Sequence, residues 1–198
     1  KIICNSSEPL TLLNTQSGFF EQKPEEWFLK TIKCLQKLKE HCPKEYKATQ
    51  SIGISGQMHG ATLIDTNNSV LRPCILWNDT RSVNECSLME NNYSFLHEET
   101  GNIAMPGFTA PKILWVKKNE SNIFKNIYKI LLPKDYLRFR LTNSYYTDMS
   151  DASGTLWLNV KNRTWSENLL ELSGLNTSHM PMLVEGSEPT EYLSNKIS

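Results

Sequence analysis

The residues with the clearest potential for ligand chemistry lie in a short polar segment, residues 56–60, which reads Gly-Gln-Met-His-Gly. The segment interrupts an apolar run, and polar side chains held between regular elements are a frequent arrangement in binding sites. The alternative is that His59 is an ordinary surface or core histidine, and residue types alone favour that alternative. The segment is therefore a candidate binding loop that needs further support.

Asp148 and Asp151 are a second candidate group, because two carboxylates close in sequence could supply a base or a metal ligand. Ser150 and Ser153 accompany them, and clusters of short polar residues are more typical of turns and helix caps. We therefore favour a turn-and-cap role for both aspartates. The sequence has no Gly-x-x-x-x-Gly-Lys-Ser/Thr, His-Glu-x-x-His or Gly-x-Ser-x-Gly motif, and its glycines are not spaced as a dinucleotide fingerprint.

Alternating apolar residues predict the strands that would hold the candidate loop. Ile52 and Ile54 alternate with small residues, which is typical of a strand that ends near Gly56. The apolar run resumes at residues 61–65, turns at the two asparagines that follow, and returns at residues 70–77, which predicts a strand pair. Further strands are expected within residues 1–13, 127–132 and 155–158, whereas the tail after Pro181 has no strong pattern.

Helices are predicted from proline starts, apolar faces and left-handed ends. Pro24 precedes two glutamates, which suit the first turn of a helix, and Pro133 begins another helix. Asp79 or Thr80 is the expected N-cap of a helix that follows Trp77. Further helices are expected from Thr109 and from Trp165, with left-handed ends at Asn143 and Gly174. The mixture of strands and helices predicts the α/β class.

Composition excludes several classes of protein. The 198 residues suffice for one substantial domain, and the 21 basic and 21 acidic residues leave no net charge to attract nucleic acid or an anionic membrane. No apolar run approaches the length of a membrane span. The five cysteines include no Cys-x-x-Cys pair, so we expect free thiols, no metal site of this kind and a cytoplasmic location. The Asn-x-Ser/Thr triplets are interpreted as chance matches in an Asn-rich chain.

Four blocks of sequence resemble the FGGY family of carbohydrate kinases, and the bacterial xylulokinases in particular. The first combines Gly-Ile-Ser-Gly-Gln-Met-His-Gly with Leu-Arg-Pro-Cys-Ile-Leu-Trp-Asn-Asp, at residues 53–60 and 71–79. The second, Gly-Phe-Thr-Ala-Pro-Lys-Ile-Leu-Trp-Val-Lys-Lys-Asn at 107–119, is similar to the first signature of that family. The others are Leu-Pro-Lys-Asp-Tyr-Leu-Arg at 132–138 and Thr-Asp-Met-Ser-Asp-Ala-Ser-Gly-Thr at 147–155. They occur in the family's order over nearly the whole chain.

The resemblance implies a ribonuclease-H-like fold of the actin and hexokinase type, with two lobes and a cleft between them. It implies transfer of the γ-phosphoryl group of ATP to the 5-hydroxyl of D-xylulose, with Mg²⁺, to give D-xylulose 5-phosphate. The implied partners are a small ketopentose and a C-terminal nucleotide lobe of the same protein. Nucleic acid and membranes are not expected as partners, and a homodimer is left open.

The resemblance also implies residues that bind the substrate. Met58 and His59 would line the sugar site, because a neutral imidazole both donates and accepts hydrogen bonds and a thioether forms an adaptable apolar wall. Trp77 is expected either to frame the pocket or to be a core aromatic. Gly107 stands where relatives carry Tyr or Arg, so its missing side chain would leave room beside the sugar. Lys112 and Trp115 are interpreted as structural.

Two expected parts of the family's site have no match in residues 1–198. The strand with an Asp-Leu-Gly-Thr turn would precede Lys1, and the catalytic Asp would follow Ser198, since neither Asp148 nor Asp151 matches it. We therefore expect residues 1–198 to be the N-terminal, sugar-binding domain of a kinase, incomplete at both ends, with no catalytic base and no metal ligand. The alternatives are an FGGY kinase for ribulose, glycerol or another polyol, and a non-catalytic sugar-binding module of the same fold.

Overall fold

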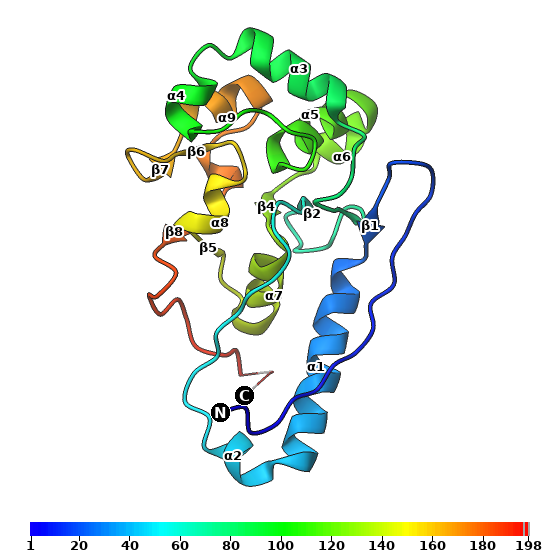
Figure 1. Ribbon diagram of the computed structural model, residues 1–198, viewed down its shortest axis with the longest axis vertical. Helices are drawn as coiled ribbons and strands as arrows, with labels where there is room; N and C mark the ends of the chain where they lie inside the picture. The colour runs from blue at the N-terminus through cyan, green and yellow to red at the C-terminus, as the bar shows by residue number, and fades with distance from the viewer. Residues whose placement is uncertain (196, 198) are drawn as a thin grey trace.

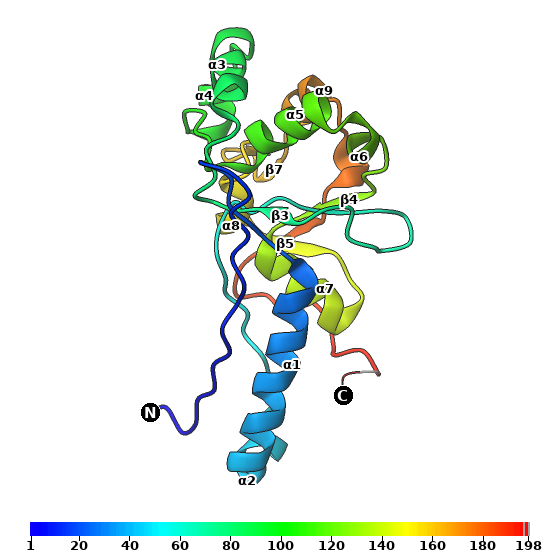
Figure 2. The ribbon, with the colours of Figure 1, turned by 90° about the vertical axis from the view of Figure 1, so that its right-hand side faces the viewer.

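The computed structural model describes residues 1–195 and 197, and it has an elongated shape with short strands at its middle (Figure 1). One end contains α3 (Val83–Asn92), α4 (Leu96–Thr100), α5 (Thr109–Asn119), α6 (Ser121–Lys125) and α9 (Glu167–Ser173). The other end contains α1 (Pro24–His41) and α2 (Pro43–Lys47), and α7 (Pro133–Thr142) packs against α1. Figure 2 shows α1 and α2 extending away from the strands.

The central strands separate two hydrophobic clusters. β2 (Thr62–Ile64) pairs antiparallel with β4 (Lys129–Leu131), and β1 (Glu21–Gln22) pairs antiparallel with β3 (Cys74–Ile75). Successive side chains of a strand point to opposite faces. The larger cluster accordingly contains Leu63, Ile75 and Ile130, and the smaller contains Ile64, Cys74 and Leu131. Short strands with both faces buried therefore form the framework on which the connecting loops are held.

Two more strand pairs lie towards the end of the chain. β5 (Tyr146–Asp148) runs parallel to β8 (Met182–Val184), and the short helix α8 (Met149–Ser153) follows β5 directly. β6 (Leu158–Asn159) and β7 (Thr164–Trp165) form an antiparallel pair, and a 3₁₀ turn covers Thr177–His179. The tail after Pro181, which has no strong sequence pattern, thus supplies a strand.

Most helix predictions are confirmed. Pro24 and Pro133 begin α1 and α7, where the missing N–H of proline costs nothing. Asn143 and Gly174 end α7 and α9 in the left-handed conformation, with φ of 64° and 80°. The prediction of the N-cap of α3 is wrong, because Ser82 occupies that position. The Asp79 carboxylate instead accepts hydrogen bonds from the backbone N–H groups of Phe20 and Arg81.

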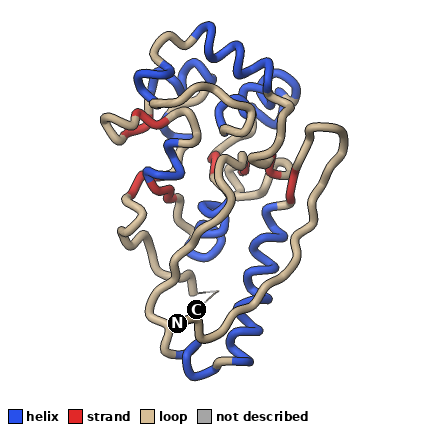
Figure 3. Tube along the Cα trace, in the orientation of Figure 1, coloured by secondary structure: helices blue, strands red, loops and turns tan. Residues whose placement is uncertain are grey.

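Three strand predictions are wrong. Residues 1–12 form no strand, and Leu13 makes only an isolated bridge with Glu21. Ile52 and Ile54 lie in a long loop (Figure 3), and the Ile52 side chain is 49% exposed. The β6 strand begins only at Leu158, because Leu156 takes a left-handed φ of 66°. β-propensity acts through packing and ladder partners. Residues 1–12, Ile52 and Ile54 have no ladder partner in the described part of the chain, whereas Leu156 and Trp157 pack in the core without joining a ladder.

No helix in the described part of the chain combines the length and apolar character needed to cross a membrane. The described residues likewise contain no cluster of three or more His, Cys, Asp or Glu side chains arranged to hold a metal ion. All five cysteines are free.

Candidate functional site

The loop of residues 56–60 links the extended segment before it to the central strands. Gly60 is buried, and a Cβ there would collide with the ring of Pro133 at the start of α7. Met58 is 53% exposed, so it is accessible to solvent and to a ligand. His59 has a left-handed φ of 62°, which is uncommon for a residue with a side chain. Such strained conformations cluster at functional sites, where the surrounding structure holds them.

The His59 ring lies between an aromatic ring and a glycine. It packs edge-on against Phe108, with ring centroids 4.6 Å apart and an interplanar angle of 86°. On its other side a Cβ at Gly154 would overlap ring atoms Cε1 and Nδ1. The buried Nδ1 atom has no hydrogen-bond partner of good geometry among the described residues. A buried polar atom without a partner is unusual. Because Nδ1 is enclosed beside Gly154, a ligand could reach the ring only through Nε2.

The electrostatic surroundings keep His59 neutral at ordinary pH. Burial lowers the pKa of the imidazole most strongly, because it disfavours the charged form. The nearby Lys112 ammonium lowers this pKa further, whereas the Gly154 backbone and Asp151 act in the opposite direction with smaller effect. A neutral imidazole has one donor and one acceptor nitrogen, as a hydroxyl ligand requires.

A fully buried lysine joins the His59 loop to the segment that carries Gly107. The Lys112 Nζ atom donates to the backbone oxygen of His59 at 3.0 Å and to that of Gly107 at 2.6 Å. The Thr109 hydroxyl donates to the same His59 oxygen at 3.1 Å. Burial lowers the pKa of Lys112 to about 8. Residues far apart in sequence are therefore held by one side chain.

Gly107 also touches the loop that carries Trp77. A Cβ at position 107 would lie 2.8 Å from the Trp77 backbone oxygen, so the close approach of the two main chains requires glycine. The turn is closed by a hydrogen bond of 2.9 Å from Phe108 N to Met105 O. The Trp77 side chain is 51% exposed, which favours a pocket wall over a core aromatic. The structure thus brings Met58, His59, Trp77 and Gly107 into one region.

Beneath Trp77 a buried network of charges fixes the loop. Arg81 contacts Asp79 at 2.8 Å and Glu21 at 2.7 Å, and its side chain is 1% exposed. Its guanidinium lies 3.9 Å from the Phe19 ring centroid and 4.9 Å from that of Trp115. Guanidinium groups stack favourably on aromatic faces. Trp115 therefore has the structural role predicted for it, since it helps to hold Arg81 under the site.

Asp148 and Asp151 are bound to a lysine. The Lys134 Nζ atom lies 2.9 Å from Asp148, 3.0 Å from Asp151 and 2.6 Å from Asp135. Asp148 also caps α8 by accepting from Asp151 N at 3.0 Å, which confirms the predicted cap role. Partial burial raises the pKa of Asp148, but hydrogen bonds from Lys134 and from the backbone outweigh this and lower it. The pair does not fit a Mg²⁺ site, because the ammonium already lies between the carboxylates.

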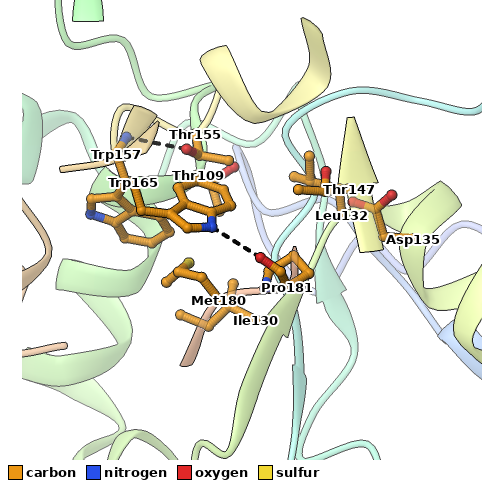
Figure 4. Close-up of a pocket in the computed structure, with 10 residues that line it drawn as sticks. All are labelled: Thr109, Ile130, Leu132, Asp135, Thr147, Thr155, Trp157, Trp165, Met180 and Pro181. Carbon is orange, nitrogen blue, oxygen red and sulfur yellow. Dashed lines mark hydrogen bonds between the residues drawn. The ribbon is translucent and has the colours of Figure 1, made fainter. Parts of the chain in front are cut away.

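Two hollows in the described structure are lined by other residues than the four predicted ones. A small cavity between β4, β5 and the Trp157 and Trp165 side chains is drawn in Figure 4. Its walls combine apolar side chains with Asp135 and three threonines, and Trp165 Nε1 donates to the backbone oxygen of Pro181 at 2.9 Å. A groove of about 320 Å³ lies between α1 and α7 and reaches Gln57 at the edge of the candidate loop.

Replacing Gly154 with alanine should disturb the site without unfolding the domain. The new methyl group would overlap the His59 ring, which must then give up its packing against Phe108, worth about 0.5–1.5 kcal/mol. We expect weaker binding of the site's ligand in the full-length protein, measured by titration calorimetry. Gly53→Ala is the matched control, because a Cβ at Gly53 meets nothing within 4 Å. Equal affinities for both variants would contradict this placement of the ring.

Solved structures define the class of protein to which this fold and loop correspond. The crystal structure of a "xyloylose kinase" from Brucella ovis superposes with a TM-score of 0.94 at 48% identity, covering 97% of this chain and 40% of that one. Glycerol kinase of Plasmodium falciparum with ADP matches with a TM-score of 0.87 at 22% identity, which shows the fold alone. The chain thus has the N-terminal fold of sugar kinases, as the resemblance implied.

Sequence comparison specifies the family. The profile described as the FGGY family of carbohydrate kinases, N-terminal domain, matches residues 1–198, and the chain belongs to this family. It is 44% identical to the xylulose kinase of Klebsiella pneumoniae over 198 residues and 46% identical to that of Escherichia coli K12 over 199 residues. Both matches cover 100% of this chain, which spans 41% and 40% of the two relatives.

Sequence reasoning missed the residues that support His59. Phe108 and Gly154 belong to two of the four sequence blocks, but nothing in the blocks says that both contact the same ring. Lys112 was expected to be structural, whereas its ammonium binds the main chain of two site segments. One signal in the sequence could have shown the role of Lys112. A lysine among the apolar residues of a helical turn is rarely buried without a partner, so it indicates a specific contact of its ammonium group.

Proposed function

We propose that this domain is the sugar-binding part of an ATP-dependent xylulose kinase, which transfers the γ-phosphoryl group of ATP to D-xylulose and gives D-xylulose 5-phosphate. The proposal is supported by the identities of 44% and 46% to xylulose kinases over the whole chain. The observation that carries it to the site is the His59 ring, which is neutral, half-buried and packed against Phe108 in a loop that Lys112 ties to Gly107.

In this proposal four residues contact the ketopentose. His59 exchanges hydrogen bonds with sugar hydroxyls, and Met58 and Trp77 offer exposed apolar surface to its carbon side. Gly107 offers only its main chain to the sugar. The space of its missing side chain faces the Trp77 backbone oxygen, 2.8 Å from an ideal Cβ, and not a sugar position as the sequence suggested. These contacts bind and orient the substrate, and none of them moves a proton in the reaction.

The remaining chemistry is assigned to other parts of the protein. ATP and Mg²⁺ would be bound by a C-terminal nucleotide lobe, which would also bring the catalytic base. This assignment is supported by the chain's share of the relatives, about two-fifths of their length, and by the engagement of Asp148 and Asp151 with Lys134. A cytoplasmic location and a homodimer stay predictions.

Two alternative functions give different results in a substrate screen of the full-length protein. A kinase for ribulose, glycerol or another polyol would turn over that compound with a higher kcat/KM than D-xylulose. A non-catalytic sugar-binding module would bind a sugar and release no ADP. We expect D-xylulose to give the highest kcat/KM.

Replacing His59 with alanine in the full-length protein should raise the KM for D-xylulose. The loss of one neutral hydrogen bond weakens binding by about 0.5–1.5 kcal/mol, or roughly two- to tenfold, and by more if a buried partner is left unpaired. ADP release at varied xylulose concentration measures the effect. His41→Ala is the control, because His41 is exposed in the last turn of α1. Unchanged KM and kcat in His59→Ala would show that this residue does not contact the sugar.

A further inference from the structure

Lys112 is the one described lysine that is fully buried. A charged group removed from water is costly unless it is paired, yet no carboxylate of the described residues lies within salt-bridge distance of its Nζ atom. Among the described residues, only the backbone oxygens of His59 and Gly107 accept its hydrogen bonds. Cys74, Asp79 and Arg81 influence the pKa of Lys112 through space, and Asp79 is already paired with Arg81.

A purely structural lysine would not be expected in this position. Apolar residues of similar volume pack a core at least as well as a buried charge does. The two backbone oxygens that Lys112 binds belong to the two segments that carry candidate sugar contacts. One is the carbonyl oxygen of His59, whose backbone is in the left-handed conformation. A side chain that ties both segments together also fixes their separation.

We propose that Lys112 is a positioning residue for the sugar site, which clamps the main chains of His59 and Gly107 in the relative position that substrate binding needs. Its ammonium has a second effect through space, because a positive charge near the His59 ring opposes protonation of the imidazole. The inference rests on the proposed function, since it takes His59 as a contact of the ketopentose. Lys112 itself touches no substrate atom in this proposal.

The test compares three variants of the full-length protein. Lys112→Met removes the charge and the hydrogen-bond donors, whereas Lys112→Gln removes the charge and keeps a donor group. Thr109→Val removes the other hydrogen bond to the His59 oxygen. Lys118→Met is the control, because Lys118 lies on the same helix with its side chain 69% exposed. Each protein is assayed for KM and kcat with D-xylulose, and the His59 pKa is measured by NMR with ¹³C-labelled histidine, its signal assigned with His59→Gln.

We expect Lys112→Met to raise the KM at least about tenfold, because the His59 and Gly107 main chains lose the group that holds them for the sugar, with a smaller change in kcat. Lys112→Gln and Thr109→Val should show smaller increases in KM. The His59 pKa should rise in both Lys112 variants and stay unchanged in Thr109→Val and Lys118→Met. If Lys112→Met does not fold, the inference is tested by the KM and His59 pKa of Lys112→Gln and by the KM of Thr109→Val.

Two results would overturn the inference. Unchanged KM and unchanged His59 pKa in Lys112→Gln would remove both effects assigned to the ammonium. A loss of thermal stability with normal KM in the folded fraction would show that Lys112 acts in folding alone. A wild-type protein that turns over another sugar, or none, would contradict the proposed function instead. The His59 pKa measurement still tests Lys112 in that case.

Discussion

Residues 1–198 alone, supplied with Mg-ATP and D-xylulose, should release no ADP above background. Phosphoryl transfer depends on positioning the γ-phosphate, neutralising its charge and orienting the attacking hydroxyl. The 198 residues contain no Gly-rich phosphate-binding motif, and the contacts proposed for them are to the sugar only. Without nucleotide positioning the reaction loses a proximity contribution of roughly 7–11 kcal/mol.

The structure supports this prediction, because both aspartates are paired with Lys134, which disfavours either as an improvised base. Lys134 binds both carboxylates, and the pKa of Asp148 is held below its usual value. A base of lowered pKa takes up a proton poorly, and losing a general base costs a factor of about 10²–10⁴.

The measurement follows ADP with a coupled assay, and the full-length protein is the positive control. Sustained xylulose-dependent ADP release from residues 1–198, abolished by His59→Ala, would contradict the prediction. Asp148→Asn and Asp151→Asn would then identify the base.

Arg81→Met in the full-length protein should cost about 3–5 kcal/mol of domain stability. The change removes a buried cation and leaves the buried Asp79 carboxylate without its arginine, while Glu21 keeps only Arg72 as a partner among the described residues. Removing one member of a buried ion pair is strongly destabilising because it leaves an uncompensated charge. It also removes the stacking on Phe19 and Trp115. Urea denaturation followed by tryptophan fluorescence measures the loss, since Trp115 lies against the substituted side chain.

An exposed ion pair supplies the control for this experiment. Arg163 pairs with Glu185 where both side chains are about half exposed, at 51% and 50%. Exposed pairs contribute about 0–1 kcal/mol, so Arg163→Met should leave the denaturation midpoint nearly unchanged. If Arg81→Met were as stable as Arg163→Met, the network beneath Trp77 would have no role in holding the loop.

Local rules predicted the helices well and several strands poorly. Pro24 and Pro133 mark helix starts because proline fits the first turn and little else, and Asn143 and Gly174 mark ends because they tolerate positive φ. A strand, in contrast, exists only through its partner. Ile52 has the alternating neighbours of a strand but no ladder to join, and Met182 has weak alternation yet pairs with Tyr146.

The candidate site was predictable as a set of segments but not as a geometry. The residue blocks point to the loop with His59, to Trp77 and to Gly107, because their order along the chain is a family pattern. Contacts between distant segments leave no local trace in sequence. The close approach of Gly107 to the Trp77 oxygen and of Gly154 to the His59 ring therefore became visible only in three dimensions.

The shared ammonium of Lys112 has a consequence for protein engineering. The His59 and Gly107 main chains are bonded to the same nitrogen, so their loops are mechanically one unit although they are encoded far apart. A loop transplanted alone from a kinase of different sugar preference would keep one hydrogen bond and strain the other. Chimeras that exchange both loops together with the first turns of α5 should retain folding and ligand binding, whereas single-loop chimeras should lose affinity for the sugars of both parents.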